Sequence, residues 1–254
     1  MSKKRNKPNV FIIGAAKSGT TSLREWLGQH PDVFTIKIEP CFFCNDIEDY
    51  RGINNVNWYL HLFDKADNKK CIIDKSAFYI YSKEAPKRIK KFSPKAKIIA
   101  ILRDPIEQMK SNHNHLYLEG KEPIRDFHKA LAAEEERKRK SKYLERFFYR
   151  DVANYKPQIE RYKKEFGKKN VLVLNFNDLK NKPKKTYLKT LKFIGLKKFE
   201  PDYSPQNIGQ NKTKRPLRHL IIFANKLPWS LKKILKIIKN NTFLKKIFEN
   251  KHKS

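Results

Sequence analysis

An apolar run from Val10 to Ile13 breaks into a loop bounded by Gly14 and Gly19, and a helical pattern follows from Thr21. A strand, a glycine-bounded loop and a helix in this order are typical of phosphate sites, because backbone N–H groups at a helix start converge on an anion. Glycines let such a loop approach its ligand closely. The pattern therefore predicts an anion-binding site at the end of the first strand.

The loop departs from the signature of nucleotide hydrolases in the position of its lysine. In that signature a lysine follows the second glycine and reaches the β- and γ-phosphates. Here Thr20 follows the second glycine, and the lysine lies inside the loop at Lys17. We therefore expect a site for an anion other than a magnesium-bound triphosphate.

Four apolar runs without polar alternation indicate strands buried on both faces. They are Val10–Ile13, Cys71–Ile73, Lys97–Leu102 and Asn170–Leu174. Helical patterns separate them and continue after them, over Thr21–Gln29, Ser82–Phe92, Pro105–Tyr117, Pro123–Arg139, Asp151–Phe166 and Lys184–Ile194. This alternation predicts a three-layer, P-loop-like α/β fold in which a central parallel sheet is flanked by helices. Ligands of such sheets bind at the carboxyl ends of the strands.

The 254 residues are enough for one core, and we expect a single domain over residues 1–254. Residues 1–8 form a basic tail, and residues 217–254 have the pattern of lysine-rich amphipathic helices. Those helices could cover the sheet of their own domain or make peripheral contact with an anionic membrane. The absence of a signal peptide or long apolar segment, together with three cysteines, predicts a cytoplasmic protein.

The net charge of +32 favours anionic partners such as nucleotides or sulfated glycans. Only 13 of the 58 basic residues are arginine, and no nucleic-acid reader motif accompanies them, so nucleic acid is disfavoured as a partner. Cys41 and Cys44 form a C-x-x-C, but further ligands at metal-site spacing are missing. We expect no metal.

A second set of polar residues follows the third run. Arg103 closes that strand, where a permanent charge needs an anion or a carboxylate such as Asp104. Ser111 lies two helical turns farther on nearly the same face. If Arg103 and Ser111 hold an anion, it is a different one from that of the loop, which implies a ligand with phosphate at two ends.

Glu39 lies among apolar residues from Ile36 to Phe43, which would disfavour its charged form and make it a better base. The competing interpretation is an ordinary ion pair with a lysine. The residues alone leave both open.

Four motifs follow one another along the chain: Gly14–Leu23, Glu39–Phe43, Asp74–Tyr79 and Leu102–Ser111. In order and spacing they resemble the sulfotransferases that use 3′-phosphoadenosine 5′-phosphosulfate (PAPS), especially the heparan sulfate N- and O-sulfotransferase branch and its bacterial-type relatives. The likeness covers about residues 9–218. PAPS has a 3′-phosphate and a 5′-phosphosulfate, so it has the two separate anionic groups that the two predicted sites require.

The resemblance implies a role for each matching residue. The loop residues would hold the 5′-phosphosulfate, with Lys17 stabilising the charge of the leaving phosphate. Glu39 would be the general base, and Lys75 would assist the sulfuryl group or orient the acceptor. Arg103 and Ser111 would bind the 3′-phosphate. The cofactor-binding set is Lys17, Ser18, Gly19, Thr20, Thr21, Ser22, Arg103 and Ser111, with Lys212, Lys214 and Arg215 as further clamps.

The implied activity is direct in-line, metal-independent transfer of a sulfonate group to a hydroxyl or amine, on a carbohydrate acceptor. Two features depart from the family: Cys41 stands where histidine is usual, and Asn211–Arg218 lacks the usual glycine. His113 and His115 are alternative bases, although helix-surface histidines are the simpler interpretation. Two other functions stay open, a P-loop nucleotide kinase in which Asp74 acts as a Walker B acid and a non-catalytic basic module that binds glycans or membranes.

Overall fold

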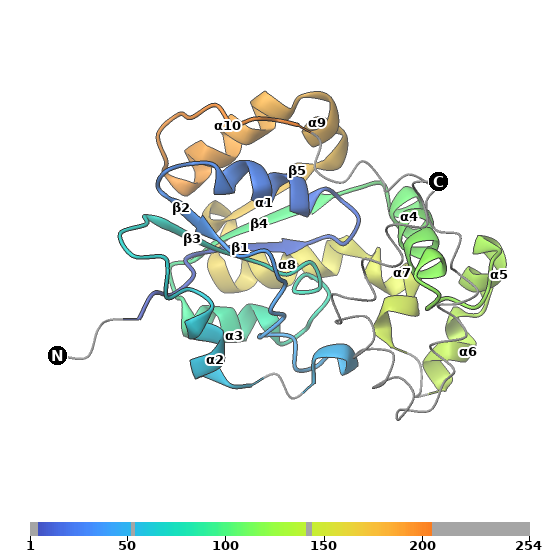
Figure 1. The fold of residues 1–254 in the computed structure, drawn as a ribbon. Helices are drawn as coiled ribbons and strands as arrows, with labels where there is room; N and C mark the ends of the chain where they lie inside the picture. Colours follow the sequence, from blue (N-terminus) through green and yellow to red (C-terminus); the bar gives the residue numbers. More distant parts are fainter. Residues whose placement is uncertain (1–4, 52–53, 141–143, 205–254) are drawn as a thin grey trace, which may run out of the picture. The chain divides into compact units, whose positions relative to one another are not determined.

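A computed structural model describes residues 5–51, 54–140 and 144–204 of the protein (Figure 1). Its five strands form one parallel sheet in the order β2-β3-β1-β4-β5. The strands are β1 Val10–Gly14, β2 Val33–Thr35, β3 Cys71–Lys75, β4 Lys97–Leu102 and β5 Val171–Asn175. The expected α/β fold is confirmed. The sequence did not predict strand β2, because three residues are too few to show a periodicity.

The helices of the described residues are α1 Thr20–Gly28, α2 Val56–His61, α3 Ala85–Phe92, α4 Pro105–Leu118, α5 Phe127–Ala132, α6 Glu134–Arg139, α7 Tyr149–Val152, α8 Tyr155–Phe166, α9 Phe176–Asn181 and α10 Pro183–Ile194. Short 3₁₀ turns cover Glu48–Tyr50, Glu145–Phe147 and Lys168–Asn170.

Alternate side chains of the central strands enter two separate apolar cores. Phe11 and Ile13 of β1 point to the face covered by α3 and α8. Ile12, between them, points to the opposite face, which α1 and α10 cover (Figure 1). All three side chains are fully buried, as strands of a doubly covered parallel sheet require.

Prolines explain two differences from the expected helices. Residues 151–166 form α7 and α8 instead of one helix, since the ring of Pro157 would clash with the carbonyl of Ala153 four residues earlier. Helix α3 begins at Ala85 rather than Ser82, which places Pro86 in the first turn, where its missing N–H is harmless. The Ser82 hydroxyl accepts the Ala85 N–H at 2.9 Å.

The expected helix over 123–139 is also divided. Asp126 caps α5 by accepting the Lys129 N–H at 2.8 Å, so the helix starts four residues later than expected. Ala133 separates α5 from α6. The first residue of α6, Glu134, is completely buried and accepts the Arg150 N–H at 2.9 Å.

The chain divides into two compact units, of which the larger comprises residues 1–114 and 126–210 and the smaller residues 115–125 and 211–254. The sheet and its flanking helices belong to the larger unit. In the smaller unit, residues 115–125 are described, and the N–H groups of Lys121 and Glu122 donate to the Leu116 carbonyl. The single-domain organisation stays a prediction.

None of the helices in residues 5–51, 54–140 and 144–204 is long and apolar enough to cross a membrane. Residues 1–4 of the proposed basic tail and all of the proposed C-terminal amphipathic helices lie outside the described residues.

Candidate active site

The loop between β1 and α1 is packed so closely that its two glycines cannot be replaced without movement. A Cβ on Gly14 would lie 2.5 Å from Ile80 Cγ2 and 2.8 Å from the Ala77 carbonyl oxygen. Gly19 has φ +83°, and a Cβ there would lie 2.7 Å from Leu179 Cδ2. The two glycines are therefore required by tight packing as well as by backbone conformation.

Groups from β4 and α4 hold the loop backbone in place. The Ala15 N–H donates to the Ile101 carbonyl at 2.8 Å. The Ala16 carbonyl accepts the side-chain amide of the buried Gln108 at 3.2 Å. Because three separate segments meet here, the loop has a fixed shape before any ligand binds.

Helix α1 starts with backbone donors rather than with a side-chain cap. Its N-cap is Gly19, which has no side chain to accept the first N–H groups. Such a start favours an anion through its N–H groups and its dipole. Thr20 is buried, whereas Thr21 and Ser22 are half-buried in the first turn. Inside the loop, Ser18 is buried and Lys17 is exposed, with φ +62°.

Lys75 links this helix start to Glu39. Its side chain is 3% exposed, and its Nζ donates to Thr21 Oγ1 at 3.3 Å and forms an ion pair with Glu39 Oε1. The second carboxylate oxygen of Glu39 accepts the Ala77 N–H at 2.7 Å. A buried ammonium needs such a partner, because an unpaired charge in this position would be strongly destabilising.

Glu39 is not enclosed by apolar groups as the sequence suggested. Its side chain is 37% exposed, and its charge is matched by Lys75, as in the competing interpretation of an ion pair. Neighbouring Ile38 is 51% exposed. The carboxylate therefore has a fixed orientation and is open to solvent, where an acceptor could reach it.

Asp74, beside Lys75 in β3, is fully buried and accepts three hydrogen bonds. The hydroxyls of Tyr59 and Tyr79 each donate to Oδ2 at 2.7 Å, and Ser76 Oγ donates to Oδ1 at 3.0 Å. Burial raises the pKa of Asp74 to about 6, although these three hydrogen bonds act in the opposite direction. With its oxygens engaged in this way, Asp74 is poorly suited to the Walker B role that the kinase alternative needs.

The Asp74 cluster also reaches the segment that carries Glu39. Cys41 lies two residues after Glu39, and its N–H donates to Ser76 Oγ at 3.1 Å. Cys41 is buried with φ +50°, so the position where the family usually has histidine is turned inward and held by its backbone. The thiols of Cys41, Cys44 and Cys71 are free.

Arg103 lies at the end of β4 and points toward the loop. It donates to the Lys17 carbonyl at 3.4 Å, and its guanidinium lies 4.8 Å from the centre of the Phe176 ring. Its carboxylate partner is Glu107, at 3.4 Å, rather than the expected Asp104, which instead accepts the Glu107 N–H at 2.9 Å. The loop and Arg103 therefore share one region of the sheet edge.

Ser111 lies in α4 and is half-buried. In the described structure it makes no hydrogen bond with Arg103, so the two residues form a site together only if a ligand bridges them. Lys212, Lys214 and Arg215 lie outside the described residues.

Two residues beside the loop were missed in the sequence. The Tyr155 hydroxyl is buried, and no described residue pairs with it in good hydrogen-bond geometry. Burial raises the pKa of Tyr155, while the Ser18 side chain and the charge of Arg103 lower it. Because Ser18 belongs to the loop, the Tyr155 hydroxyl lies next to the loop. Phe176, at the start of α9, contacts both Arg103 and the Gly19 position. An unpartnered donor at a rigid, glycine-bounded helix start fits a phosphate-bearing ligand.

The two alternative bases have different environments. His113 is buried rather than on the helix surface, and its ring packs 5.7 Å from Phe127 and 5.9 Å from Tyr149. His115 has a 43% exposed side chain and lies 3.4 Å from Glu119 one turn away, as the simpler interpretation of a helix-surface histidine expects. No group of three or more potential metal ligands occurs among the residues that the structure describes.

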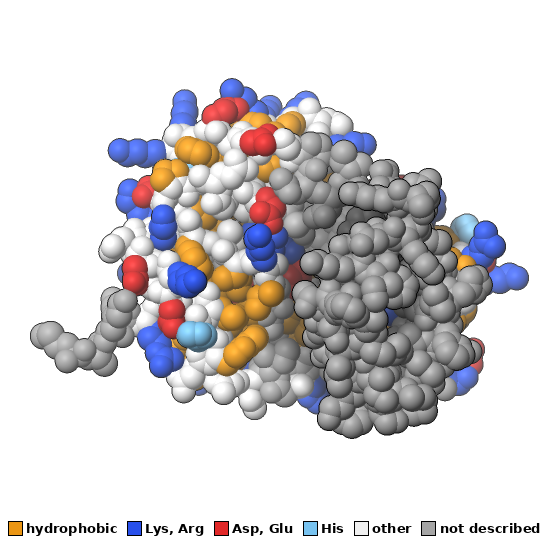
Figure 2. All heavy atoms as spheres, in the orientation of Figure 1, with side chains coloured by type: hydrophobic (Ala, Val, Ile, Leu, Met, Phe, Trp, Pro, Cys, Tyr) orange, Lys and Arg blue, Asp and Glu red, His pale blue; other side chains and the backbone are white. Residues whose placement is uncertain are grey.

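Basic side chains are scattered over the visible described surface, with acidic side chains between them (Figure 2). That view favours a general lysine bias over one continuous basic groove on this face.

Comparisons with known proteins agree with the sequence motifs. A family model for the sulfotransferase domain matches residues 7–246. The bifunctional heparan sulfate N-deacetylase/N-sulfotransferase 1 of Mus musculus is 31% identical over 199 residues, which are 74% of this chain and 22% of that protein. Heparan sulfate glucosamine 3-O-sulfotransferase 6 of Homo sapiens is 34% identical over 110 residues, 43% of this chain and 31% of that protein. The chain thus spans less than a third of the length of these relatives.

Among solved structures, a sulfotransferase from Alicyclobacillus acidocaldarius superposes with a TM-score of 0.74 at 32% identity. The match covers 79% of this chain and 86% of that one. The sulfotransferase domain of the Synechococcus PCC 7002 olefin synthase, at 19% identity and a TM-score of 0.54, supports the fold alone. The resemblance and the enzyme class expected from the motifs are confirmed, and this chain belongs to the sulfotransferase domain family.

Proposed function

We propose that the protein transfers a sulfonate group from PAPS to a hydroxyl or amine of an acceptor, with a carbohydrate as the acceptor class. Lys75 supplies the observation that carries this proposal. Its ammonium contacts Thr21 at the anion-binding helix start and Glu39 at the same time. One buried charge therefore joins the group that would hold the donor to the group that would receive a proton.

PAPS would supply the sulfonate and a phosphate leaving group. Lys17 and the donors at the start of α1 would bind the 5′-phosphosulfate, and Arg103 and Ser111 the 3′-phosphate. The Tyr155 hydroxyl is a further donor within reach of the loop. Preorganised donors of this kind stabilise charge that develops on the leaving phosphate.

In the proposed step, an acceptor oxygen or nitrogen forms a bond to sulfur as the bond between sulfur and the phosphate oxygen breaks. The electron pair of that bond leaves with the phosphate, and Glu39 takes the acceptor proton. Lys75 stabilises charge on the sulfonate oxygens and keeps the Glu39 carboxylate oriented. Transfer is direct and in line, with no intermediate bonded to the protein.

The carbohydrate class is supported by the two heparan sulfate sulfotransferases among the relatives and by the solvent-open side of Glu39. A large acceptor needs an accessible base, and a carboxylate with a 37% exposed side chain meets that need. A non-catalytic glycan-binding module would also use basic surface, but it would have no need of a lysine held between a carboxylate and a helix start.

Calorimetric titration of the folded protein with 3′-phosphoadenosine 5′-phosphate tests the donor site. We expect saturable binding that weakens about tenfold or more in Lys17→Ala and in Arg103→Ala, since each removes a charged hydrogen bond. Lys87→Ala, which removes the same charge from an exposed position of α3, should bind normally. No binding by the folded protein would refute the proposal.

A screen of oligosaccharide acceptors with labelled PAPS tests the transfer. Glu39→Gln should lower the transfer rate by about 10²- to 10⁴-fold and leave nucleotide binding unchanged, because a general base acts only in the chemical step. Retained glycan binding without transfer to any acceptor, by wild type and variant alike, would instead support the non-catalytic module.

A further inference from the structure

Three consecutive residues, at and just after the end of β3, hold the segment that carries Glu39. Lys75 forms an ion pair with the Glu39 carboxylate, and the Ala77 N–H donates to the other carboxylate oxygen at 2.7 Å. Ser76, between them, accepts the Cys41 N–H on its Oγ at 3.1 Å. The candidate base is therefore held through its side chain and through the backbone two residues later.

Helix α1 holds the same segment on its other side. The buried Arg24 donates from Nη1 to the Lys37 carbonyl at 2.7 Å, two residues before Glu39. The segment is thus fixed before Glu39 by a guanidinium and after it by the Ser76 hydroxyl. Loss of the Ser76 contact should let Glu39 move while Arg24 keeps the segment in place.

Asp74 orients the Ser76 hydroxyl. Both side chains are completely buried, and Ser76 Oγ donates to Asp74 Oδ1 at 3.0 Å. The hydroxyls of Tyr59 and Tyr79 donate to Oδ2. An ionised carboxylate only accepts hydrogen bonds, so it satisfies all three hydroxyls at once. With its proton directed at Asp74, the Ser76 oxygen has a lone pair for the Cys41 N–H.

A proton on Asp74 disturbs this arrangement at Ser76. Oδ1 receives one hydroxyl donor and Oδ2 receives two, so Oδ1 is the oxygen with room for the proton. The new O–H then donates to Ser76 Oγ, and the Ser76 hydroxyl loses the acceptor of its own proton. Because a buried hydroxyl without an acceptor is destabilising, Ser76 turns and its bond with the Cys41 N–H weakens.

The other groups near Asp74 do not titrate in the same range. The titratable groups that face Asp74 are Tyr59 of α2, Tyr79 after β3, Tyr162 of α8, and Cys44 and Glu39 in the segment after β2. Burial raises the pKa of each of these tyrosines and of Cys44 well above its ordinary value, so they stay neutral. Lys75 extends to the opposite face of the sheet, toward Thr21 of α1.

We propose that Asp74, Tyr59, Tyr79 and Ser76 form a positioning network for Glu39, which keeps this base in place only while Asp74 is ionised. The inference rests on the proposed sulfonate transfer, in which Glu39 takes the acceptor proton. The network touches no reacting atom and acts through the Ser76 hydroxyl and the backbone after Glu39. It gives the buried carboxylate of Asp74 a role at the site in addition to its place in the fold.

Amide NMR of the folded full-length protein tests the network without any transfer. From pH 5 to pH 8, the Cys41 amide resonance of the wild type should shift with a midpoint at about pH 6, since burial raises the pKa of Asp74 to about 6. The shift should be absent in Asp74→Asn and in Ser76→Ala. In Ser76→Ala the Ala77 amide should also exchange with solvent about tenfold faster, because Glu39 is no longer held against it.

The pH dependence of sulfonate transfer from PAPS tests the positioning role. The wild-type kcat should fall about tenfold from pH 7 to pH 5, because the ionised fraction of Asp74 falls by about that factor. Asp74→Asn mimics the protonated acid, since its amide N–H donates to Ser76 Oγ when its oxygen accepts from the tyrosines. Its kcat should therefore be independent of pH, equal to that of the wild type at pH 5 and about tenfold lower at pH 7. Binding of 3′-phosphoadenosine 5′-phosphate should be unchanged.

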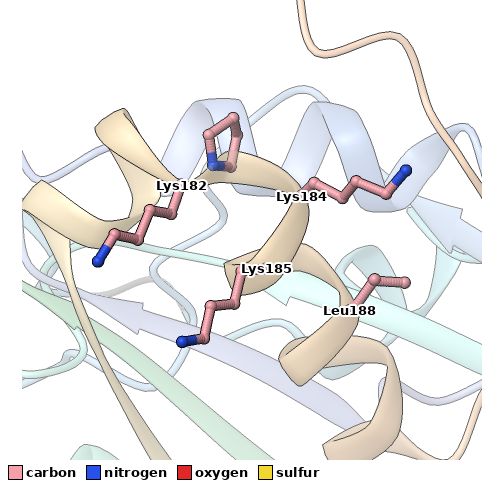
Figure 3. A pocket seen from close by; sticks show the side chains of 5 residues that line it. Lys182, Lys184, Lys185 and Leu188 are labelled. Carbon is pink, nitrogen blue, oxygen red and sulfur yellow. The ribbon is translucent and has the colours of Figure 1, made fainter.

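Two variants away from the network are controls. Thr190→Val removes a completely buried hydroxyl that donates to a backbone carbonyl of α10 at 2.9 Å, so it shows the effect of losing one buried hydrogen bond. Lys185→Ala removes one positive charge from the exposed lysines that line a hollow at the start of α10 with Pro183 and Leu188 (Figure 3). Neither variant should move the Cys41 midpoint by more than about 0.2 pH units, because exposed charges are screened by salt.

The inference is overturned if the wild-type Cys41 amide does not titrate at about pH 6. It is also overturned if Asp74→Asn transfers sulfonate at the wild-type rate at pH 7 or keeps the wild-type acid limb. Titration of Cys41 without transfer to any acceptor would support the network and count against the proposed function. If Ser76→Ala does not fold, the wild type and Asp74→Asn still decide the result.

Discussion

The buried carboxylate of Asp74 makes a quantitative prediction about stability and pH. Its pKa is raised from 3.8 to about 6, first by burial, against the effect of its three hydroxyl donors. The folded state therefore binds more protons than the unfolded state between about pH 4 and 6. Stability is greatest below the unfolded pKa, falls as pH rises through this window and levels off above about pH 6.

The size of this effect follows from the displacement of the pKa. A rise from 3.8 to about 6 corresponds to about 3 kcal/mol of unfolding free energy lost across the window. Asp74→Asn removes the titration while keeping the shape, and an amide oxygen can still accept from Tyr59 and Tyr79. Any change in the hydrogen bonds themselves shifts stability by an amount that does not depend on pH.

Urea unfolding of wild type and Asp74→Asn from pH 4 to pH 7 measures the effect. We expect the variant's stability relative to wild type to rise by about 2 kcal/mol over that range, because at pH 4 the unfolded carboxyl is already partly ionised. Asp178→Asn, an exposed aspartate, is the control for the loss of one carboxylate. If the difference between Asp74→Asn and wild type is the same at both ends of the range, burial of Asp74 does not govern its titration and the reasoning fails.

Two further predictions concern the loop and its support. Gly19→Ala should lower the free energy of unfolding by more than the about 1–2 kcal/mol that a non-glycine residue costs in the left-handed conformation, because its Cβ would also lie 2.7 Å from Leu179 Cδ2. Gly195 is the control, since it has a left-handed backbone and a Cβ there would have nothing within 4 Å. In thermal unfolding, Gly195→Ala should therefore show only the conformational effect. Equal losses in the two alanine variants would contradict the packing argument. Tyr59→Phe should lower the free energy of unfolding by about 1–3 kcal/mol at neutral pH, since it removes a hydrogen-bond donor to the buried Asp74 carboxylate. A loss of stability confined to acidic pH would contradict this role of Tyr59.

The sequence was sufficient for the features that depend on local patterns. Apolar runs without alternation identified the four longer strands of the sheet, because strands covered on both faces need continuous apolar sequence. The glycine spacing from Gly14 to Gly19 identified the loop, because the close backbone contacts there exclude side chains. Local signals also failed in recognisable places: Pro157 and Asp126 divide or delay helices whose apolar pattern continues through them.

Only the tertiary structure decided which charges meet. Lys75 lies 36 residues from Glu39 and 54 from Thr21, yet its ammonium contacts both. The sequence left two settings open for Glu39, apolar surroundings or an ion pair with a lysine, and folding gave it a buried lysine on one side and solvent on the other. The burial of Asp74 and the proximity of Tyr155 to the loop likewise depend on the packing of distant segments. Sequence patterns record the periodicity of one element at a time, whereas the electrostatics of a site depend on contacts between elements.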